Sequence, residues 1–383
     1  MGKILKLGFT GDFSFEGFFI QNLKSGIATF STEIVNFLEH NDYNIFNIEG
    51  PITNAPSNKL KGVALSSDPL VIGILKALKC NVFGLANNHI MDCGVEGLKD
   101  TLNLAKDHHI LYFGAGKEIN EASQPVVLQN GHTKVALLGM CHCEGQIADQ
   151  RSPGVFCDRF ESHLKMRIKE SKRHCDWVVL VYHGGEEYTY YPMPKRREKL
   201  IKYLNYGVDI IVCHHAHTVQ GYEVFGNKYI FYSLGNFVFD MDYQYTRDGA
   251  CYSVLLSLGF QKKLFTFNYL LTKIDRENRV VKPNHDHTNF GAIDNRNYPF
   301  LWNRDAARLI FSRINNNKAN CLNNQFSTKA SNNLSSPKLC LNIEVFKALC
   351  IYLRQPNLRP ILFSALQYEL SKRLPLIFNY PKC

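Results

Sequence analysis

The first 300 residues alternate short apolar runs with longer amphipathic stretches. The short runs are rich in Val, Ile, Leu and Phe, and each leads into a polar or glycine-containing loop. Such runs are typical of buried strands, whereas the longer stretches have the period of helices. The alternation predicts an α/β fold with a mostly parallel sheet covered by helices. The expected strands are 4–10, 44–48, 82–85, 135–139, 177–182, 210–213 and 228–233, and the expected helices are 32–40, 69–78, 95–107, 159–172 and 195–205.

The pattern changes after about residue 250. Segments 251–258 and 264–272 resemble antiparallel strands, and we expect them to complete the sheet at its edge. The composition is 45% hydrophobic and 20% charged, which is typical of a globular protein with a sizeable core and excludes a disordered or fibrous chain.

The last 80 or so residues predict a separate extension. Residues 315–338 are rich in Asn and Ser and favour a linker, whereas 341–353 and 359–374 have the pattern of two basic helices. A single hydrophobic core usually stops growing at about 250 to 300 residues. We therefore expect one domain over 1–300 and a mostly helical extension over 301–383.

The positive charge of the chain is concentrated in this extension. The formal net charge is +10, but residues 301–383 hold twelve Lys and Arg against three Asp and Glu, which leaves +1 for residues 1–300. Aromatic residues of the extension, such as Tyr352 and Phe363, are spaced like core residues of packed helices. Binding of nucleic acid or of an anionic membrane by this extension stays open as an alternative function. Of these two, we do not expect nucleic acid among the partners.

No apolar run approaches the roughly 18 residues that a membrane-spanning helix needs, and we expect a cytoplasmic protein, with peripheral association at the inner membrane face as an option. The twelve cysteines contain no C-x-x-C pair and predict scattered reduced thiols. Cys141 and Cys143 lie one residue apart without a second pair, so we leave them out of the predicted site.

Polar side chains follow several of the predicted strands. Because the carboxyl ends of parallel strands share one edge of a sheet, we expect these side chains to converge. Two carboxylates, one carboxamide and several imidazoles form a mixed ligand set that suits Mn, Fe or Zn. A two-metal hydrolytic centre needs such a set, in which a carboxylate bridges the ions. The carboxylates of this ligand set are Asp12 and Glu49, and its carboxamide is Asn88. The polar residues at the strand ends are Asp12, Asn47, Glu49, Asn87, Asn88, His89, His183, His214, His215 and His217.

These residues also stand in motifs that resemble a known family. The chain is similar to the capsule-synthesis CapA family, also called poly-gamma-glutamate capsule proteins, a branch of the calcineurin-like metallophosphoesterases. The resemblance covers roughly residues 5–242. The motifs, in order, are Gly11-Asp12, Asn47-Ile48-Glu49, Ala86-Asn87-Asn88-His89-Ile90-Met91-Asp92-Cys93-Gly94, His183-Gly184-Gly185-Glu186-Glu187-Tyr188, His214-His215-Ala216-His217 and Tyr232-Ser233-Leu234-Gly235-Asn236-Phe237-Val238-Phe239-Asp240.

The resemblance implies a metallophosphoesterase-like fold of layered sheets flanked by helices, and a centre that holds two divalent transition-metal ions. By this resemblance Asp12 and His217 hold one ion, and Asn88, His183 and His215 hold the other. The implied activity is metal-dependent hydrolysis of a phosphoester or related bond in capsule, poly-gamma-glutamate or other surface-polymer metabolism. The substrate would be an anionic small molecule or polymer.

The resemblance also implies roles around the two ions. Glu49 would lie between them as the bridging carboxylate, and His89 would donate a hydrogen bond or a proton toward the leaving group. Asp92 could orient His89, and Glu187 could orient His183, although capping of a loop remains an alternative for both acids.

Two further residues have open roles, and one departure from the family pattern leaves a second function open. His214 could contact substrate or be structural, and Asn236 could reach the site or form a turn. The superfamily pattern begins Asp-x-His, but here Asp12 is followed by Phe13 and Ser14, so one imidazole is missing. The alternative is a non-catalytic accessory or assembly protein of the surface-polymer synthesis machinery with a partial metal site.

Overall fold

The computed structural model describes residues 3–57, 62–143, 145–285, 290–310, 312, 353 and 359–373. The chain divides into two compact units. Unit 1 consists of Met1–Tyr188 and Lys195–Ala292, and unit 2 consists of Thr189–Pro194 and Ile293–Cys383.

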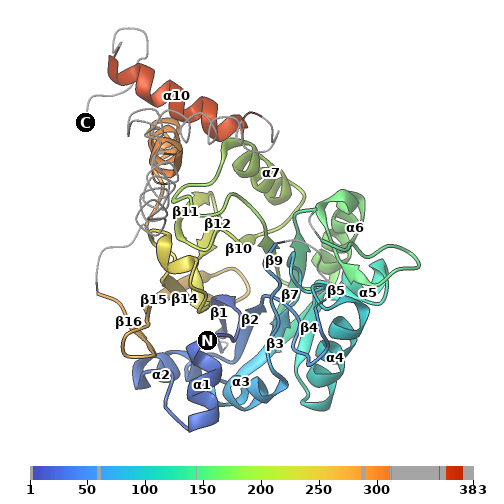
Figure 1. Ribbon diagram of the computed structural model, residues 1–383. Helices are drawn as coiled ribbons and strands as arrows, with labels where there is room; N and C mark the ends of the chain where they lie inside the picture. The colour runs from blue at the N-terminus through green and yellow to red at the C-terminus, as the bar shows by residue number, and fades with distance from the viewer. Residues whose placement is uncertain are drawn as a thin grey trace, which may run out of the picture. The chain divides into compact units, whose positions relative to one another are not determined.

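Two large sheets form the frame of unit 1 (Figure 1). The first has the strand order β16-β15-β14-β1-β2-β3-β4, with β13 paired to β1, and the second has the order β11-β12-β10-β9-β7-β6. The strands are β1 (Leu5–Phe13), β2 (Tyr43–Ile48), β3 (Cys80–Gly84), β4 (Leu111–Phe113), β5 (Ala115–Gly116), β6 (Val126–Asn130), β7 (Thr133–Cys141), β8 (Gly154–Val155), β9 (Trp177–His183), β10 (Ile210–His214), β11 (Val219–Phe225), β12 (Lys228–Leu234), β13 (Asn236–Val238), β14 (Tyr252–Phe260), β15 (Phe265–Asp275) and β16 (Val280–Pro283).

The centre of each sheet is parallel. Strands β1 to β4 run parallel to one another, as do β7, β9, β10 and β12, whereas β14 is antiparallel to β1. The connections between the parallel strands contain most of the helices. These are α1 (Phe18–Ser25), α2 (Thr32–Glu39), α3 (Ile72–Ala77), α4 (Gly94–Asp107), α5 (Ile119–Ala122), α6 (Glu161–His174) and α7 (Pro194–Asn205), with 3₁₀ turns at Pro69–Val71, Asp158–Phe160 and Gln244–Thr246.

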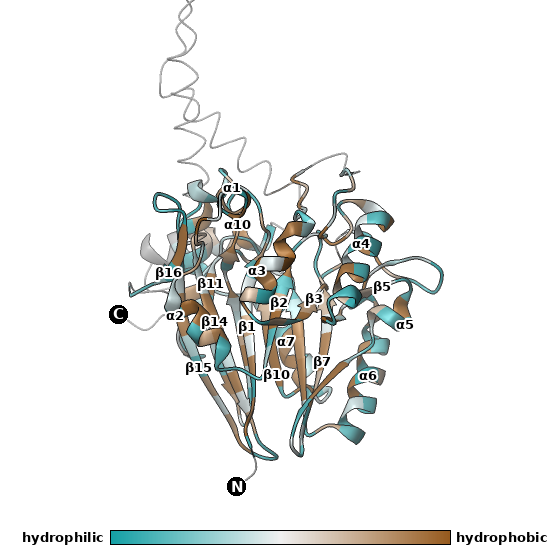
Figure 2. Cartoon of the chain, turned by 90° about the horizontal axis from the view of Figure 1, so that it is seen from below, coloured by the Kyte–Doolittle hydropathy of each residue, from teal (hydrophilic) through white to brown (hydrophobic). Residues whose placement is uncertain are grey.

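The two sheets of unit 1 pack face to face. Phe9 of β1 and Leu256 of β14 belong to one apolar cluster with Val179 of β9 and Val212 of β10, so this cluster fills the space between the sheets. Each such side chain stabilises the fold by about 1.5–3 kcal/mol on burial. Figure 2 shows strands of both sheets in the brown of hydrophobic residues, whereas α4 and α6 show teal and brown sides.

A second cluster covers the other face of the first sheet. It joins Phe46 of β2 to Leu38 of α2, Leu75 of α3 and Leu98 of α4. The helices therefore shield one face of the sheet, and the second sheet shields the other. The predicted α/β fold of layered sheets and flanking helices is confirmed. The apolar pattern predicted a single sheet, whereas unit 1 has two large sheets. The pattern could not distinguish the two cases, because a buried strand has the same apolar sequence whether a helix or another sheet covers it.

Unit 2 is described in part. Residues 298–310 are helical, and α10 spans Arg359–Arg373, which agrees with the helix predicted over 359–374. The Nε1 of Trp302 donates to Oγ of Ser364 at 2.8 Å, which joins these helices. The predicted linker 315–338 and residues 341–352 of the other predicted helix lie outside the described residues.

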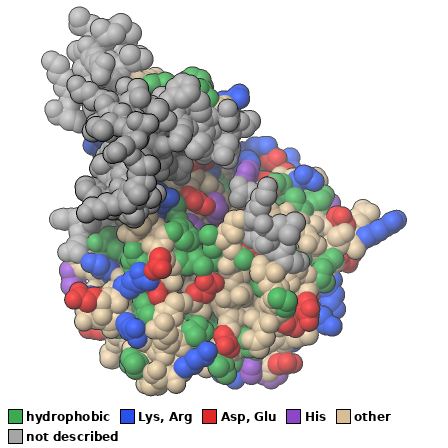
Figure 3. Space-filling model, viewed as in Figure 1, with side chains coloured by type: hydrophobic (Ala, Val, Ile, Leu, Met, Phe, Trp, Pro, Cys, Tyr) green, Lys and Arg blue, Asp and Glu red, His purple; other side chains and the backbone are tan. Residues whose placement is uncertain are grey.

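Acidic and basic side chains are interspersed over the face seen in Figure 3, as expected from the nearly neutral first 300 residues. Among the described residues, no helix has the length and apolar character needed to cross a membrane.

Candidate metal centre

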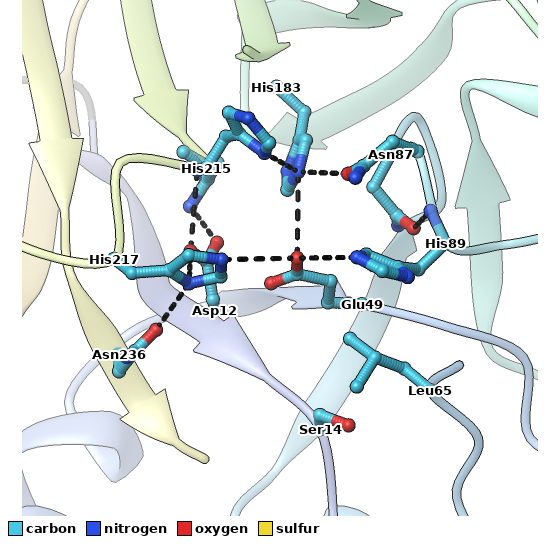
Figure 4. A network of polar contacts seen from close by, with 12 residues as sticks. Asp12, Ser14, Glu49, Leu65, Asn87, His89, His183, His215, His217 and Asn236 are labelled. Carbon is cyan, nitrogen blue, oxygen red and sulfur yellow. Dashed lines mark hydrogen bonds and ion pairs between the residues drawn. The ribbon is translucent and has the colours of Figure 1, made fainter. Parts of the chain in front are cut away.

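Polar side chains from both sheets of unit 1 converge at one place (Figure 4). They come from the carboxyl ends of parallel strands and from the loops that follow these strands. Ligands of α/β proteins usually bind at this edge of the sheet. The structure thus brings together the residues that the sequence singled out from distant segments. They are Asp12 of β1, Glu49 after β2, Asn88 and His89 after β3, His183 of β9, and His215 and His217 after β10.

Glu49 occupies the middle of this cluster. It is fully buried, and neither of its carboxylate oxygens has a hydrogen-bond partner among the described residues. The Nε2 atoms of His183 and His217 lie 3.8 Å from its Oε1, and that of His89 lies 4.0 Å away. These distances exceed a hydrogen bond. A buried carboxylate surrounded by ring nitrogens at this spacing suits a bound cation better than direct pairing.

Asp12 is held by contacts from the second sheet and from β2. Its Oδ1 accepts a hydrogen bond from Nδ2 of Asn47 at 2.8 Å, and its Oδ2 accepts one from the backbone N–H of His215 at 3.3 Å. Burial opposes ionisation of Asp12, but contacts with His214 and His217 outweigh it and hold the pKa of this carboxyl well below its usual value. Asp12 is therefore an anion at neutral pH.

His183 and His215 form the opposite side of the cluster. The Nε2 of His183 lies 2.9 Å from Oδ1 of Asn88 and 3.2 Å from Nδ1 of His215. Burial, reinforced by His215, lowers the pKa of His183 well below its usual value, and burial lowers the pKa of His215 to about 4. Both rings are neutral at neutral pH and hold lone pairs, which is the form that binds a metal ion.

His217 links Asp12 to Asn236. Its Nδ1 lies 2.8 Å from Oδ1 of Asn236 and 3.3 Å from Oδ2 of Asp12. Burial disfavours charge on this ring, but Glu49 and Asp12 outweigh it and raise its pKa to about 10. His215 and His217 both have positive φ, 89° and 55°, which is uncommon for residues other than glycine and typical of constrained functional loops.

His89 lies on the more accessible side of the centre. Its Nδ1 is 2.6 Å from Oδ2 of Asp92, and its backbone N–H donates to Oδ1 of Asn87 at 3.1 Å. Asp92 also accepts a hydrogen bond from the backbone N–H of Leu65 at 2.9 Å. One ring nitrogen of His89 is thus fixed, and the other faces Glu49.

Three predicted residues with open roles, His214, Asn236 and Glu187, remain to be placed in the structure. His214 is buried, with Nδ1 3.4 Å from Oδ1 of Asp12. Asn236 is also buried, and its Nδ2 donates to the backbone carbonyl of Ala250 at 2.9 Å. Glu187, which was predicted to orient His183, is exposed. The group beside the Nδ1 of His183 is the side chain of Asn47, whose Nδ2 lies 3.4 Å away.

Two asparagines outside the predicted ligand set support the centre. Asn47 contacts Asp12, as described above, and Asn87 connects two loops. The Nδ2 of Asn87 donates to the carbonyl of Ile48 at 2.7 Å, and its Oδ1 accepts the N–H of Gly50 at 3.3 Å. Asn87 directly precedes the predicted ligand Asn88, and Asn47 stands two residues before Glu49, so proximity to a predicted ligand in the sequence could have indicated both.

Sequence reasoning missed an aromatic wall beside His217. The ring of Tyr188 stacks on His217 with centroids 5.9 Å apart, and Phe239 contacts the same ring at 5.1 Å. The guanidinium of Arg247 lies 5.4 Å from the Tyr188 ring centroid. Tyr188 and Phe239 stand in the motif segments, but an aromatic residue after a strand does not by itself indicate a site.

Comparison with known proteins identifies the family. The family model described as "Bacterial capsule synthesis protein PGA_cap" matches residues 6–241. The chain belongs to this family. The match includes every residue of the cluster described above.

Named relatives agree with this assignment. The chain is 34% identical to the "PGA biosynthesis protein CapA" of Bacillus subtilis (strain 168) over 73% of its own length and 74% of that protein. It is 34% identical to the "Capsule biosynthesis protein CapA" of Bacillus anthracis over 56% of its length and 54% of that protein. A third relative, from Mycobacterium tuberculosis (strain ATCC 25618 / H37Rv), is named "Probable polyglutamine synthesis accessory protein Rv0574c". It is 26% identical over 52% of this chain and 56% of that protein.

Proposed function

We propose that this PGA_cap protein is a metal-dependent hydrolase of a phosphoester or related bond in surface-polymer metabolism. The observation that carries the proposal is the Glu49 carboxylate, which is fully buried without a hydrogen-bond partner among the described residues, while three imidazoles face it. A buried carboxylate in this state is costly unless a cation compensates it.

The side chains present fit two divalent ions. Asp12 and His217 would hold one ion, whereas Asn88, His183 and His215 would hold the other. A ligand set of oxygens and imidazole nitrogens suits Mn, Fe or Zn. The ligand atoms of Glu49, His215 and His217 lie within 4.8 Å of one another, which supports Glu49 as the residue shared between the ions.

Divalent ions bound here would polarise a substrate oxygen and activate water for attack on phosphorus. The chain itself would contribute His89, whose Nε2 faces the centre and could donate a proton to the leaving oxygen. Asp92 holds the opposite nitrogen and keeps the ring in the donating orientation.

The relatives supply the biological setting of this proposal. Two of them are named for PGA or capsule biosynthesis, so we infer an anionic small molecule or polymer of that metabolism as substrate. The surface-polymer synthesis machinery is the corresponding partner.

The test combines metal analysis with hydrolysis. Purified full-length protein should retain roughly two transition-metal ions per chain and cleave bis(p-nitrophenyl) phosphate with added Mn²⁺. His217→Ala should lose one ion and Asn88→Ala the other, whereas His132→Ala, at an exposed position, should keep both. Wild-type protein without metal and without hydrolysis would refute the proposal.

A second candidate function is that of an accessory protein with a partial metal site. Ser14 stands where the superfamily pattern has histidine, and its hydroxyl donates to Oε1 of Glu16 at 3.4 Å. Figure 4 shows Ser14 outside the network of contacts. One relative is also named an accessory protein. Wild-type protein that holds one ion and hydrolyses neither phosphodiesters nor phosphomonoesters would favour this function.

A further inference from the structure

A pair of cysteines lies outside the metal centre. The Sγ atoms of Cys143 and Cys157 are 2.7 Å apart, although the residues are separated by 14 positions in the sequence. Uncharged heavy atoms that are not bonded rest at roughly 3.5–4 Å. The sulfur–sulfur distance is therefore closer to the roughly 2.05 Å of a disulfide bond than to an ordinary contact.

The backbone around the two cysteines fixes this approach. Cys141, the last residue of β7, pairs with Cys157 in an isolated bridge, and its N–H donates to the carbonyl of Phe156 at 2.8 Å. The N–H of Arg159 lies 3.2 Å from the sulfur of Cys143 and 3.4 Å from that of Cys157. Main-chain contacts on both sides thus place the two side chains against each other.

We propose that Cys143 and Cys157 form a disulfide bond that fixes residues 145–157 beside the metal centre. A low-molecular-weight disulfide is the oxidant. One cysteine thiolate attacks it and releases one small thiol, and the second cysteine thiolate attacks the mixed disulfide and releases another. The two electrons pass to the small disulfide, and the two cysteine protons end on the two released thiols.

A metal ion is the competing occupant, because Cys143, Cys157 and Asp158 offer ligand atoms within 4.8 Å of one another. Two thiolates on a tetrahedral zinc ion, each at ~2.3 Å, stand roughly 3.8 Å apart, well beyond the observed separation. The Oδ2 of Asp158 is also occupied, since Nζ of Lys199 lies 2.7 Å and the hydroxyl of Tyr182 3.0 Å from it. The lysine ammonium would repel a cation, so the geometry favours the disulfide.

The segment that the bond would fix touches two residues of the centre. A Cβ added at Gly145 would lie 2.8 Å from the backbone oxygen of Asn88, so the two main chains are in close contact there. The N–H of His142 donates to the carbonyl of His183 at 2.8 Å. The bond would therefore restrain the backbone next to Asn88 and His183. Burial raises the pKa of Cys143 to about 12, with Cys157 adding to the shift, so thiolate is scarce and exchange at neutral pH should be slow.

Peptide mapping of the full-length protein tests the proposal. The protein is equilibrated with oxidised or reduced glutathione, alkylated, and digested with trypsin without reduction. The oxidised sample should yield peptide 135–151 linked to peptide 152–159, with fragmentation placing the link at Cys143. Alkylation of Cys143 and Cys157 to the same extent in both samples would overturn the proposal.

Two physical measurements accompany the mapping. The oxidised protein should unfold about 5 °C above the reduced protein, because the link closes a loop of about 15 residues. Amide exchange of residues 145–157 should also slow on oxidation. Cys143→Ser should abolish both differences, and Cys175→Ser, which removes a partly exposed thiol elsewhere, should preserve them. One zinc ion per chain that is lost in Cys143→Ser would instead establish a metal site and refute the disulfide.

Discussion

The Nδ1 of His89 lies 2.6 Å from Oδ2 of Asp92, while the Nε2 of the same ring lies 4.0 Å from Oε1 of Glu49. The carboxylate of Asp92 thus fixes one side of the ring, and the other side faces the carboxylate of Glu49 in the middle of the cluster. This arrangement distinguishes His89 from His183, His215 and His217, which are more deeply buried within the cluster.

Replacement of His89 should affect turnover and leave metal content unchanged. We expect His89→Gln to lower kcat for a phosphodiester by about 10²- to 10⁴-fold, because the proton donor is lost. Asp92→Asn should lower it by about 10- to 100-fold, because the ring loses its orientation. Steady-state kinetics and elemental analysis measure both effects. Loss of metal in His89→Gln would instead make His89 a ligand.

Glu49→Gln should separate metal binding from stability. Burial raises the pKa of the Glu49 carboxyl well above its usual value, and neither oxygen has a hydrogen-bond partner among the described residues. Because only the unfolded chain ionises this carboxyl freely at neutral pH, the neutral amide should raise the free energy of unfolding of the metal-free protein by about 1–2 kcal/mol. The variant should also lose the stabilisation that Mn²⁺ gives to wild type. Urea unfolding with EDTA or Mn²⁺ measures both, with exposed Glu39→Gln as the control. A metal-free Glu49→Gln protein less stable than wild type would contradict this account.

Gly11 should be intolerant of a side chain. A Cβ at Gly11 would lie 2.2 Å from the carbonyl oxygen of Gly235. The same oxygen accepts a hydrogen bond from the N–H of Asp12 at 2.8 Å. The backbone of Gly235 therefore cannot move away without disturbing Asp12. Gly11→Ala should therefore destabilise the protein by about 3 kcal/mol and weaken metal binding.

The matched control is Gly73→Ala in α3. A Cβ there meets nothing within 4 Å, and alanine should stabilise the helix by about 0.5–1 kcal/mol. Thermal unfolding of both variants checks the pair, and equal melting temperatures would show that the packing around Gly11 is looser than described.

Asp158 should give a pH-dependent contribution to stability. Burial opposes its ionisation, but contacts with His142 and Lys199 outweigh burial and hold the pKa of Asp158 well below its usual value. Because the folded pKa lies below the unfolded one, this stabilisation is present above about pH 4 and is lost as the pH falls through the folded pKa. Asp158→Asn should cost about 1 kcal/mol at pH 7 and progressively less below pH 4.

Urea unfolding of reduced protein at pH 7, 5 and 3 measures this difference. Exposed Asp107→Asn serves as the control and should match wild type within error. A difference between wild type and Asp158→Asn that stays constant from pH 7 to pH 3 would exclude the proposed role of the carboxylate.

The sequence predicted the central strands because buried apolar runs are long and bounded by polar loops. It missed α1, which starts after Gly17 without a side-chain cap, and it missed β13, which has only three residues. It also placed β14 at the edge of the sheet, whereas β14 pairs with β1 inside it. Apolar runs identify strands, but they do not identify the neighbours with which strands pair.

The inventory of the site could be predicted from residues at strand ends, but their contacts could not. The pairing of Asn47 with Asp12 depends on the register of β1 against β2, and the position of His214 beside Asp12 depends on how the two sheets meet. The contact of Cys143 with Cys157 could not be predicted either, because the sequence contains no second pair of closely spaced cysteines. Cys157 is brought close by the pairing of Cys141 with residue 157, which leaves no pattern in the sequence.

The antiparallel neighbour of β1 and the histidines opposite Asp12 both come late in the chain. Asp12 and His215 are 203 residues apart, so a ribosome adding about 5–20 residues per second releases the first roughly 10–40 s before the second. During that interval β1 has no β14 beside it, and the future buried carboxylates remain in water. Newly made N-terminal halves therefore carry an unpaired, apolar strand edge, which is open to pairing with other chains until β14 has been made.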